Sequence, residues 1–195
     1  MQITKLNAFS RLLDRPKTET EDPDAYHWYA MRVFNGRVFR IRDEIESAGM
    51  ETYMAMKTVD LMRDGALVYE QKQIVPSLLF VRTDLRWLLG FKHVHFSDIL
   101  LYRSGKGGPP APIPDSEMDM FMFVTSAGKG ADVELLGNDF SCFKKGERVR
   151  VVDGIYKGAE GIVKRIRRDR KLLVAVNGVA VVAISNIPVQ FLEKI

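Results

Sequence analysis

The sequence predicts an α+β fold in two parts, an antiparallel sheet with helices packed against it and then a small five-stranded β-barrel. Residues 27–126 give strand-like and helical runs in the order β-α-β-β-β-α-β-α, whereas residues 143–195 give only short strand-like runs bounded by glycine or charge. A glycine-bearing stretch of weak periodicity separates them. We therefore expect an extension at 1–25, a first domain at 26–126, a linker at 127–142 and a second domain at 143–195.

The first domain opens with a strand at 27–33, rich in aromatic and β-branched residues. Asn35 is expected to cap a helix over 36–48, because Val38, Ile41 and Ile45 recur at the spacing of one helical face. Gly49 ends that helix. A second strand is expected at 51–59, and the hairpin signal Asp64-Gly65 returns the chain as a third strand at 66–74.

After Pro76 comes a short apolar run, 78–81, which predicts a buried strand. A helix within 84–92, a strand near 99–102 and a loop over 105–114 follow. Asp115 is expected to cap a last helix that ends at Ser126, with Met118, Phe121 and Met122 facing inward.

The second domain is basic. From Lys144 to Ile195 the chain has 12 Lys and Arg against 5 Asp and Glu, a balance of +7 in a chain whose total is +4, so residues 1–143 carry −3. Its strands are expected at 147–152, 161–166 and 172–176, with glycines at the turns. This asymmetry suggests a nucleic-acid or ribonucleoprotein neighbourhood.

The second domain starts with a hydrophobic strand, a short loop, Gly161 and then alternating hydrophobic residues. This order resembles the KOW motif, in which Gly161 is the structural glycine. The first domain resembles the NGN domain of the NusG/Spt5 family of transcription elongation factors. Its matching features are Trp28-Tyr29, Asn35-Gly36 and the run from Ile74 to Val81, where Ser77 and Leu78 depart from the family pattern. The Pro76-Ser77 variant, the hairpin and Pro112–Asp115 are most similar to UpxY-type antiterminators of capsular polysaccharide operons.

The resemblance implies an NGN-type sheet followed by an SH3-like barrel, and it implies function as well. The expected partner is the RNA polymerase largest subunit, bound at its clamp helices so that pausing or termination is suppressed. The residues that match by position are Arg32, Leu78 and Phe80; the alternative for Leu78 and Phe80 is a purely structural role in the core. Arg37 and Arg40 match positions near the non-template DNA strand, where arginine can grip phosphate, or they are simply solvated.

The basic run that contains Lys164, Arg165, Arg167 and Arg168 is either a contact for RNA or a solvated turn, because no aromatic residues interleave with it. NusG couples to Rho and to ribosomal protein S10 through a phenylalanine after the last KOW strand, where this chain has Asn177-Gly178. Those two links therefore stay open. The alternative function is a ribosome- or RNA-associated KOW protein.

No catalytic, metal or cofactor site is expected, so an enzyme is the weak hypothesis. His93 and His95 share strand-like spacing but lack a third ligand, and Gly105–Gly108 lacks P-loop spacing. Cys142, the single cysteine, excludes an intrachain disulfide and fits a reducing cytoplasm. Neither a secretion signal nor a membrane span is predicted.

Overall fold

The computed structural model describes residues 25–127, 132–137, 146–166, 169–176 and 178–195. It is an α+β structure with antiparallel sheets, as the sequence predicts. The first sheet has the strand order β2-β5-β1-β6. Its strands are β1 (His27–Val33), β2 (Glu51–Tyr53), β5 (Leu78–Thr83) and β6 (Ile99–Leu101).

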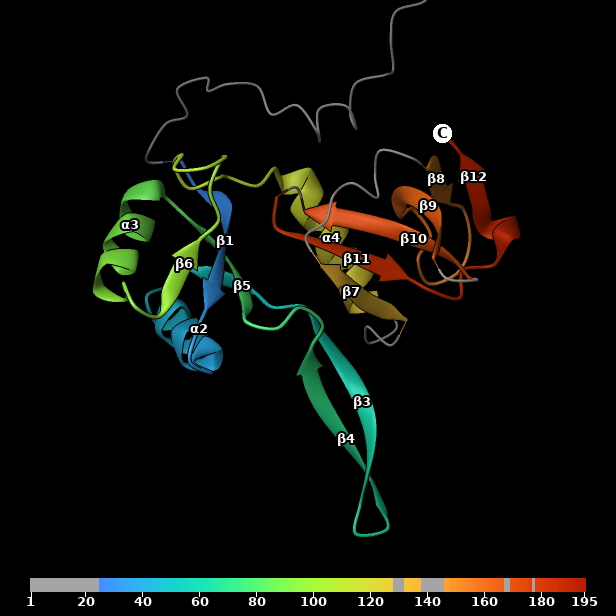
Figure 1. Ribbon diagram of the computed structural model, residues 1–195, viewed down its shortest axis with the longest axis horizontal. Coiled ribbons are helices and arrows are strands. Elements are labelled where there is room, and N and C mark those ends of the chain that lie inside the picture. Colours follow the sequence, from blue (N-terminus) through green and yellow to red (C-terminus); the bar gives the residue numbers. More distant parts are fainter. Residues whose placement is uncertain (1–24, 128–131, 138–145, 167–168, 177) are drawn as a thin grey trace, which may run out of the picture.

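Alternation along β1 and β5 gives this sheet two apolar faces. Tyr29, Met31, Val33, Leu79 and Val81 point to one face, where they pack with α2 (Val38–Ser47) and α3 (Leu85–Val94). Trp28, Ala30, Leu78 and Phe80 point to the opposite face, towards α4 (Asp115–Ser126). Helices therefore cover both faces, with α2 and α3 on one side of the sheet and α4 on the other (Figure 1).

A long hairpin projects from the first sheet (Figure 1). It consists of β3 (Met56–Arg63) and β4 (Ala66–Gln73), joined at Asp64-Gly65, where both residues have positive φ. The single strand expected over 51–59 is thus two strands, which separate at Met54 and Ala55. Ala55 is buried and accepts a backbone hydrogen bond from Ile74, which fixes the base of the hairpin.

The second sheet has the strand order β12-β8-β9-β10-β11-β7. Its strands are β7 (Val133–Gly137), β8 (Glu147–Val151), β9 (Glu160–Ile166), β10 (Asp169–Val176), β11 (Ala180–Ile184) and β12 (Leu192–Lys194), with the 3-10 turn η3 (Val189–Phe191) before β12. We call it the C-terminal sheet. Strand β7 lies within the segment 127–142 that is expected to be a linker. It pairs with β11 and forms one edge of the C-terminal sheet.

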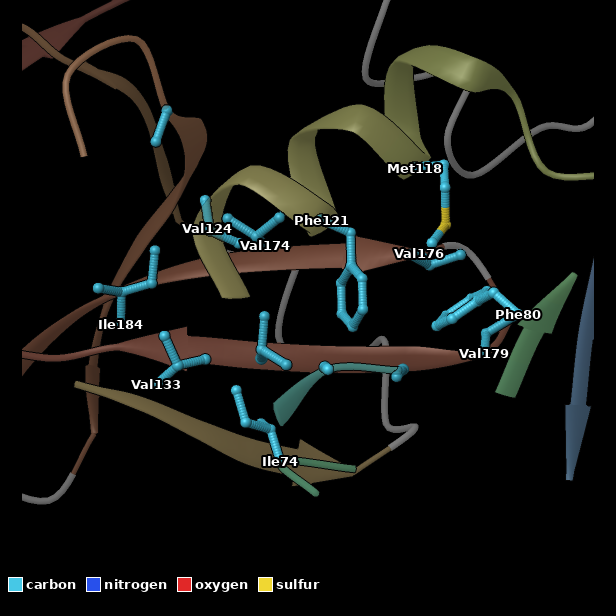
Figure 2. Packing of buried hydrophobic residues seen from close by; sticks show 14 of the residues in the cluster. Ile74, Phe80, Met118, Phe121, Val124, Val133, Val174, Val176, Val179 and Ile184 are labelled. Atoms are coloured by element: carbon cyan, nitrogen blue, oxygen red, sulfur yellow. The ribbon is translucent and has the colours of Figure 1, made fainter. Parts of the chain in front are cut away.

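The two sheets share one hydrophobic core. Met118, Phe121 and Val124 of α4 belong to one buried cluster with Phe80 of the first sheet and with Val174 and Val176 of β10, all of which Figure 2 labels. Met118, Phe121 and Val124 are fully buried, whereas Met122 is half-buried, so the inward stripe differs by one position from the expected one. The two parts of the chain are therefore packed against each other through apolar side chains.

The start of α2 differs from the expected cap. Arg37, not Asn35, is the N-cap, and no side chain caps the helix. Asn35 and Gly36 both have positive φ, and the Asn35 side chain donates to Asp98 Oδ1 at 3.2 Å. Asparagine tolerates this left-handed conformation better than most residues, so it serves the turn instead of the cap.

Candidate functional site

The candidate site is the face of the first sheet formed by Trp28, Ala30, Leu78 and Phe80, which we call the Phe80 face. The strands β1 and β5 are antiparallel with Arg32 opposite Leu78 and Ala30 opposite Phe80. Opposite residues and alternate residues of antiparallel strands share a face. Arg32, Leu78 and Phe80, selected from the sequence, are thus brought together on one side of the sheet.

The Phe80 face is covered in this structure. Leu78 and Phe80 are 3% and 0% exposed. The Phe80 ring lies 5.3 Å from that of Phe121 on α4 and 6.5 Å from that of Tyr53, centroid to centroid. Figure 2 also places Phe80 beside Val176 and Val179 of the C-terminal part. A partner can therefore reach Leu78 and Phe80 only after α4 or the C-terminal sheet has moved.

Arg32 lies at the exposed end of this face. Its guanidinium carbon is 5.8 Å from the centroid of the Phe34 ring, within cation–π range. Burial raises the pKa of the Tyr102 hydroxyl, and the positive charge of Arg32 partly offsets that rise. The site thus has an accessible cation at its edge and an apolar interior.

The turn that leads into β5 is held by a side chain that sequence reasoning missed. Ser77 has a φ of 63°, a conformation in which glycine is the usual residue. Gln73 Oε1 accepts a hydrogen bond from the Ser77 amide at 3.1 Å, and Gln73 Nε2 donates to the Leu78 carbonyl at 3.3 Å. A glutamine at a strand end gives no signal in the sequence, so its role emerges only from the structure.

Arg37 and Arg40 lie on the α2 side of the sheet, away from the Phe80 face. Arg37 donates to Asp98 Oδ2 at 2.5 Å, and Arg40 donates to Glu44 Oε1 at 2.8 Å. The hydrogen bond from Arg37 lowers the pKa of the Asp98 carboxyl, against the opposing effect of burial. Both arginines keep substantial exposed surface, 47% and 69% of their side chains.

The basic run of the second domain begins at the end of β9. Lys164 and Arg165 lie on β9, opposite Lys171 and Arg170 of β10, whereas Arg167 and Arg168 lie outside the described residues. Nearby, Gly161 is tightly enclosed, because a Cβ added there would lie 2.3 Å from the Leu173 carbonyl oxygen. Only glycine fits that position without a shift of the β9–β10 pair.

Comparison with known proteins relates the first part of the chain to one family. Residues 26–122 match the family model described as "Transcription termination factor nusG". This part of the chain is similar to the NusG family. The match spans the Phe80 face, the hairpin and most of α4.

Two curated relatives are NusG proteins named "Transcription termination/antitermination protein NusG". The one from Pseudomonas aeruginosa is 24% identical over 163 residues, which cover 78% of this chain and 89% of the relative. The one from Borreliella burgdorferi is 24% identical over 162 residues, 75% of this chain and 85% of the relative. A solved structure titled "Domain interaction in Thermotoga maritima NusG" aligns over 89% of this chain and 99% of its own, with 18% identity and a TM-score of 0.45.

Two further observations concern the described residues alone. These residues contain no group of three or more His, Cys, Asp or Glu side chains placed to hold a metal ion. In the same part of the chain, every helix is too short or too polar to cross a bilayer. Cys142 lies outside the described residues.

Proposed function

We propose that this protein is a NusG-like transcription elongation and antitermination factor that binds the clamp helices of the RNA polymerase largest subunit through Arg32, Leu78 and Phe80. The observation that supports this proposal best is the Phe80 face itself, an apolar surface within the part of the chain that matches the NusG family model. An apolar face edged by an arginine suits the tip of a partner helix pair.

Binding at this face requires the docked form to open. Leu78 and Phe80 are buried under α4 and the C-terminal sheet, so polymerase competes with the chain's own packing. We propose that polymerase selects a form in which the C-terminal sheet has separated from α4, so that α4 in turn can leave the Phe80 face. The affinity observed for polymerase is then the intrinsic affinity reduced by the fraction of open molecules.

Nucleic-acid contacts are a second element of the proposal. Arg37 and Arg40 are exposed enough to reach the non-template strand, but each would have to exchange a carboxylate partner for phosphate. Lys164, Arg165, Arg167 and Arg168 are proposed as an RNA or ribonucleoprotein contact of a KOW-type domain. Links to Rho and ribosomal protein S10 are not part of the proposal, because Asn177-Gly178 replaces the phenylalanine on which they depend.

The proposed gene targets rest on the features of this chain that resemble UpxY-type antiterminators. Ser77 occupies a left-handed position at the turn before β5, and the long β3–β4 hairpin projects from the sheet. These features are similar to UpxY-type antiterminators, so we propose that the chain acts at specific operons such as those for surface polysaccharides. A cytoplasmic location and the absence of a cofactor accompany this proposal.

The proposal is tested by retention of the full chain on purified RNA polymerase. We expect binding that is lost when the tip of the clamp helices is deleted, and that is weakened by Arg32→Ala, an exposed substitution that spares the core. Lys157→Ala, an equally exposed substitution in the C-terminal part, is the matched control. If polymerase does not bind while ribosomes or RNA do, the chain is instead a KOW protein of translation.

A further inference from the structure

The C-terminal part contains a small pocket beside the end of β8 and the start of β12. Both strands lie at the end of the C-terminal part that is farther from α2 and α3 (Figure 1). The turn after β8 and the segment before β12 enclose a hollow of about 170 Å³. This volume is below that of typical small-molecule sites, about 300–1,000 Å³, and suits one side chain. The pocket is separate from the Phe80 face and has no part in the proposed polymerase contact.

Close packing of the turn on an aromatic ring shapes the pocket. Gly154 has a φ of 82°, and a Cβ added there would lie 3.3 Å from the Phe191 ring. The Asp153 carboxylate accepts from the Gly154 amide at 2.8 Å, and the Val152 amide donates to the Phe191 carbonyl at 2.8 Å. The walls are therefore fixed by the backbone as well as by side chains.

An unpaired hydroxyl lies among the residues that line the pocket. Tyr156 is 4% exposed, and its hydroxyl has no hydrogen-bond partner within the described chain. Burial, and secondarily the charge of Asp132, raise the pKa of this hydroxyl, so it stays protonated near neutral pH. A buried hydroxyl without a partner is uncommon in native proteins and points to a ligand that supplies one.

The remaining lining is apolar with two carboxylates. Asp132 Oδ1 accepts from Asn186 Nδ2 at 2.8 Å, and Asp153 adds a second negative charge. The apolar walls include Ile155, which is 59% exposed, and Val189 close by is 57% exposed. Two carboxylates disfavour an anion, while the apolar walls suit an aliphatic stem.

We propose that this pocket binds an arginine side chain of a protein partner, with apolar residues on either side of that arginine resting on Ile155 and Val189. The guanidinium pairs with Asp132 and donates to the Tyr156 oxygen, which gives the buried hydroxyl a hydrogen-bond partner. Arginine fits better than lysine because its planar fork reaches two acceptors at once. The partner is thus a segment in which arginine stands between apolar residues.

The test is an NMR titration of the full chain with the peptide acetyl-Val-Arg-Val-amide, and with the same peptide carrying citrulline, an uncharged isostere of arginine. We expect shifts centred on Gly154, Ile155 and Tyr156, and binding of the citrulline peptide about tenfold weaker, the factor for one charge-assisted hydrogen bond. Asp132→Asn should abolish the preference for arginine. Asp119→Asn, which removes an exposed carboxylate from α4, should leave it unchanged.

Tyr156→Phe separates binding from folding. The substitution removes only a hydroxyl that has no partner, so the chain should keep or slightly gain stability while it loses affinity for the arginine peptide. The proposal is overturned if both peptides bind alike, if neither shifts the pocket resonances, or if Tyr156→Phe leaves the arginine affinity unchanged.

Discussion

Phe80 on β5 and Phe121 on α4 place their ring centroids 5.3 Å apart, with a tilt of 56° between the rings. Tyr53 closes the cluster, with its ring 6.4 Å from that of Phe121. The Tyr53 hydroxyl also hydrogen-bonds with Thr125 Oγ1 at 2.6 Å, which ties the first sheet to the end of α4. Because α4 also packs on β10, Phe121 lies where the two parts of the chain meet (Figure 2).

Replacing Phe121 by alanine is expected to destabilise both parts of the chain together. The ring is fully buried, and loss of a buried phenylalanine costs about 3–5 kcal/mol. Phe123, which is 38% exposed on the same helix, provides the control, and its substitution should cost far less. Urea unfolding followed through β1 and β10 resonances measures both, and the shared core is contradicted if β10 is unaffected by Phe121→Ala.

Two glycines should respond in opposite directions to alanine. Gly161→Ala forces a Cβ towards the Leu173 carbonyl, and overpacking of this kind costs about 1–3 kcal/mol. Gly90→Ala lies in α3 with nothing within 4 Å of the added Cβ, so it should stabilise by up to about 1 kcal/mol through helix propensity. Thermal unfolding of the two variants beside the parent measures both signs, and a neutral Gly161→Ala would contradict the close approach of β9 to β10.

The Arg37–Asp98 pair gives the fold an acid-sensitive element. Since the pKa of Asp98 is lowered in the folded chain, its contribution to stability is present above the usual aspartate range and is lost as the pH falls through the lowered value. Arg37→Met removes the main cause of the shift, so the Asp98 pKa should rise and acid destabilisation should begin at a higher pH. Carboxyl NMR titration measures this, with Arg42→Met, whose partner is Asp43, as control. An unchanged Asp98 pKa in Arg37→Met would show that the pair is not the cause.

Local patterns in the sequence predict much of the first sheet. Apolar residues on both faces of β1 and β5 are typical of a sheet covered on both sides, and the alternation correctly places Leu78 and Phe80 on a shared face. Whereas Pro114, not the expected Asp115, is the N-cap of α4 and no side chain caps that helix, Gly49 and Asp64-Gly65 fix the ends of elements through purely local chemistry. These features depend on residues close together in the chain, so they can be found from the sequence.

The features that the sequence does not predict depend on residues far away in the chain. Strand β7 is short and weakly alternating, and it is a strand because β11 offers it an edge. Asn35 leaves the cap position because Asp98, 63 residues away, accepts its side chain. The cover over Phe80 could not be predicted either, since an apolar stripe on α4 fits equally well against the first sheet alone or between two sheets.

The central claim is that α4 and the C-terminal sheet cover the polymerase-binding face, and that the C-terminal sheet must separate from α4 before this face is uncovered. The most direct measurement joins α4 to β10 through cysteines at Val124 and Val174, two buried residues of the core that α4 and β10 share, in a chain whose Cys142 is replaced by serine. A disulfide or a short bis-thiol crosslinker closes the pair, and each single-cysteine chain is the control. The account predicts that the closed chain does not bind RNA polymerase and that reduction of the disulfide restores binding. Equal binding by the closed and reduced chains would show that polymerase does not need the Phe80 face to be uncovered.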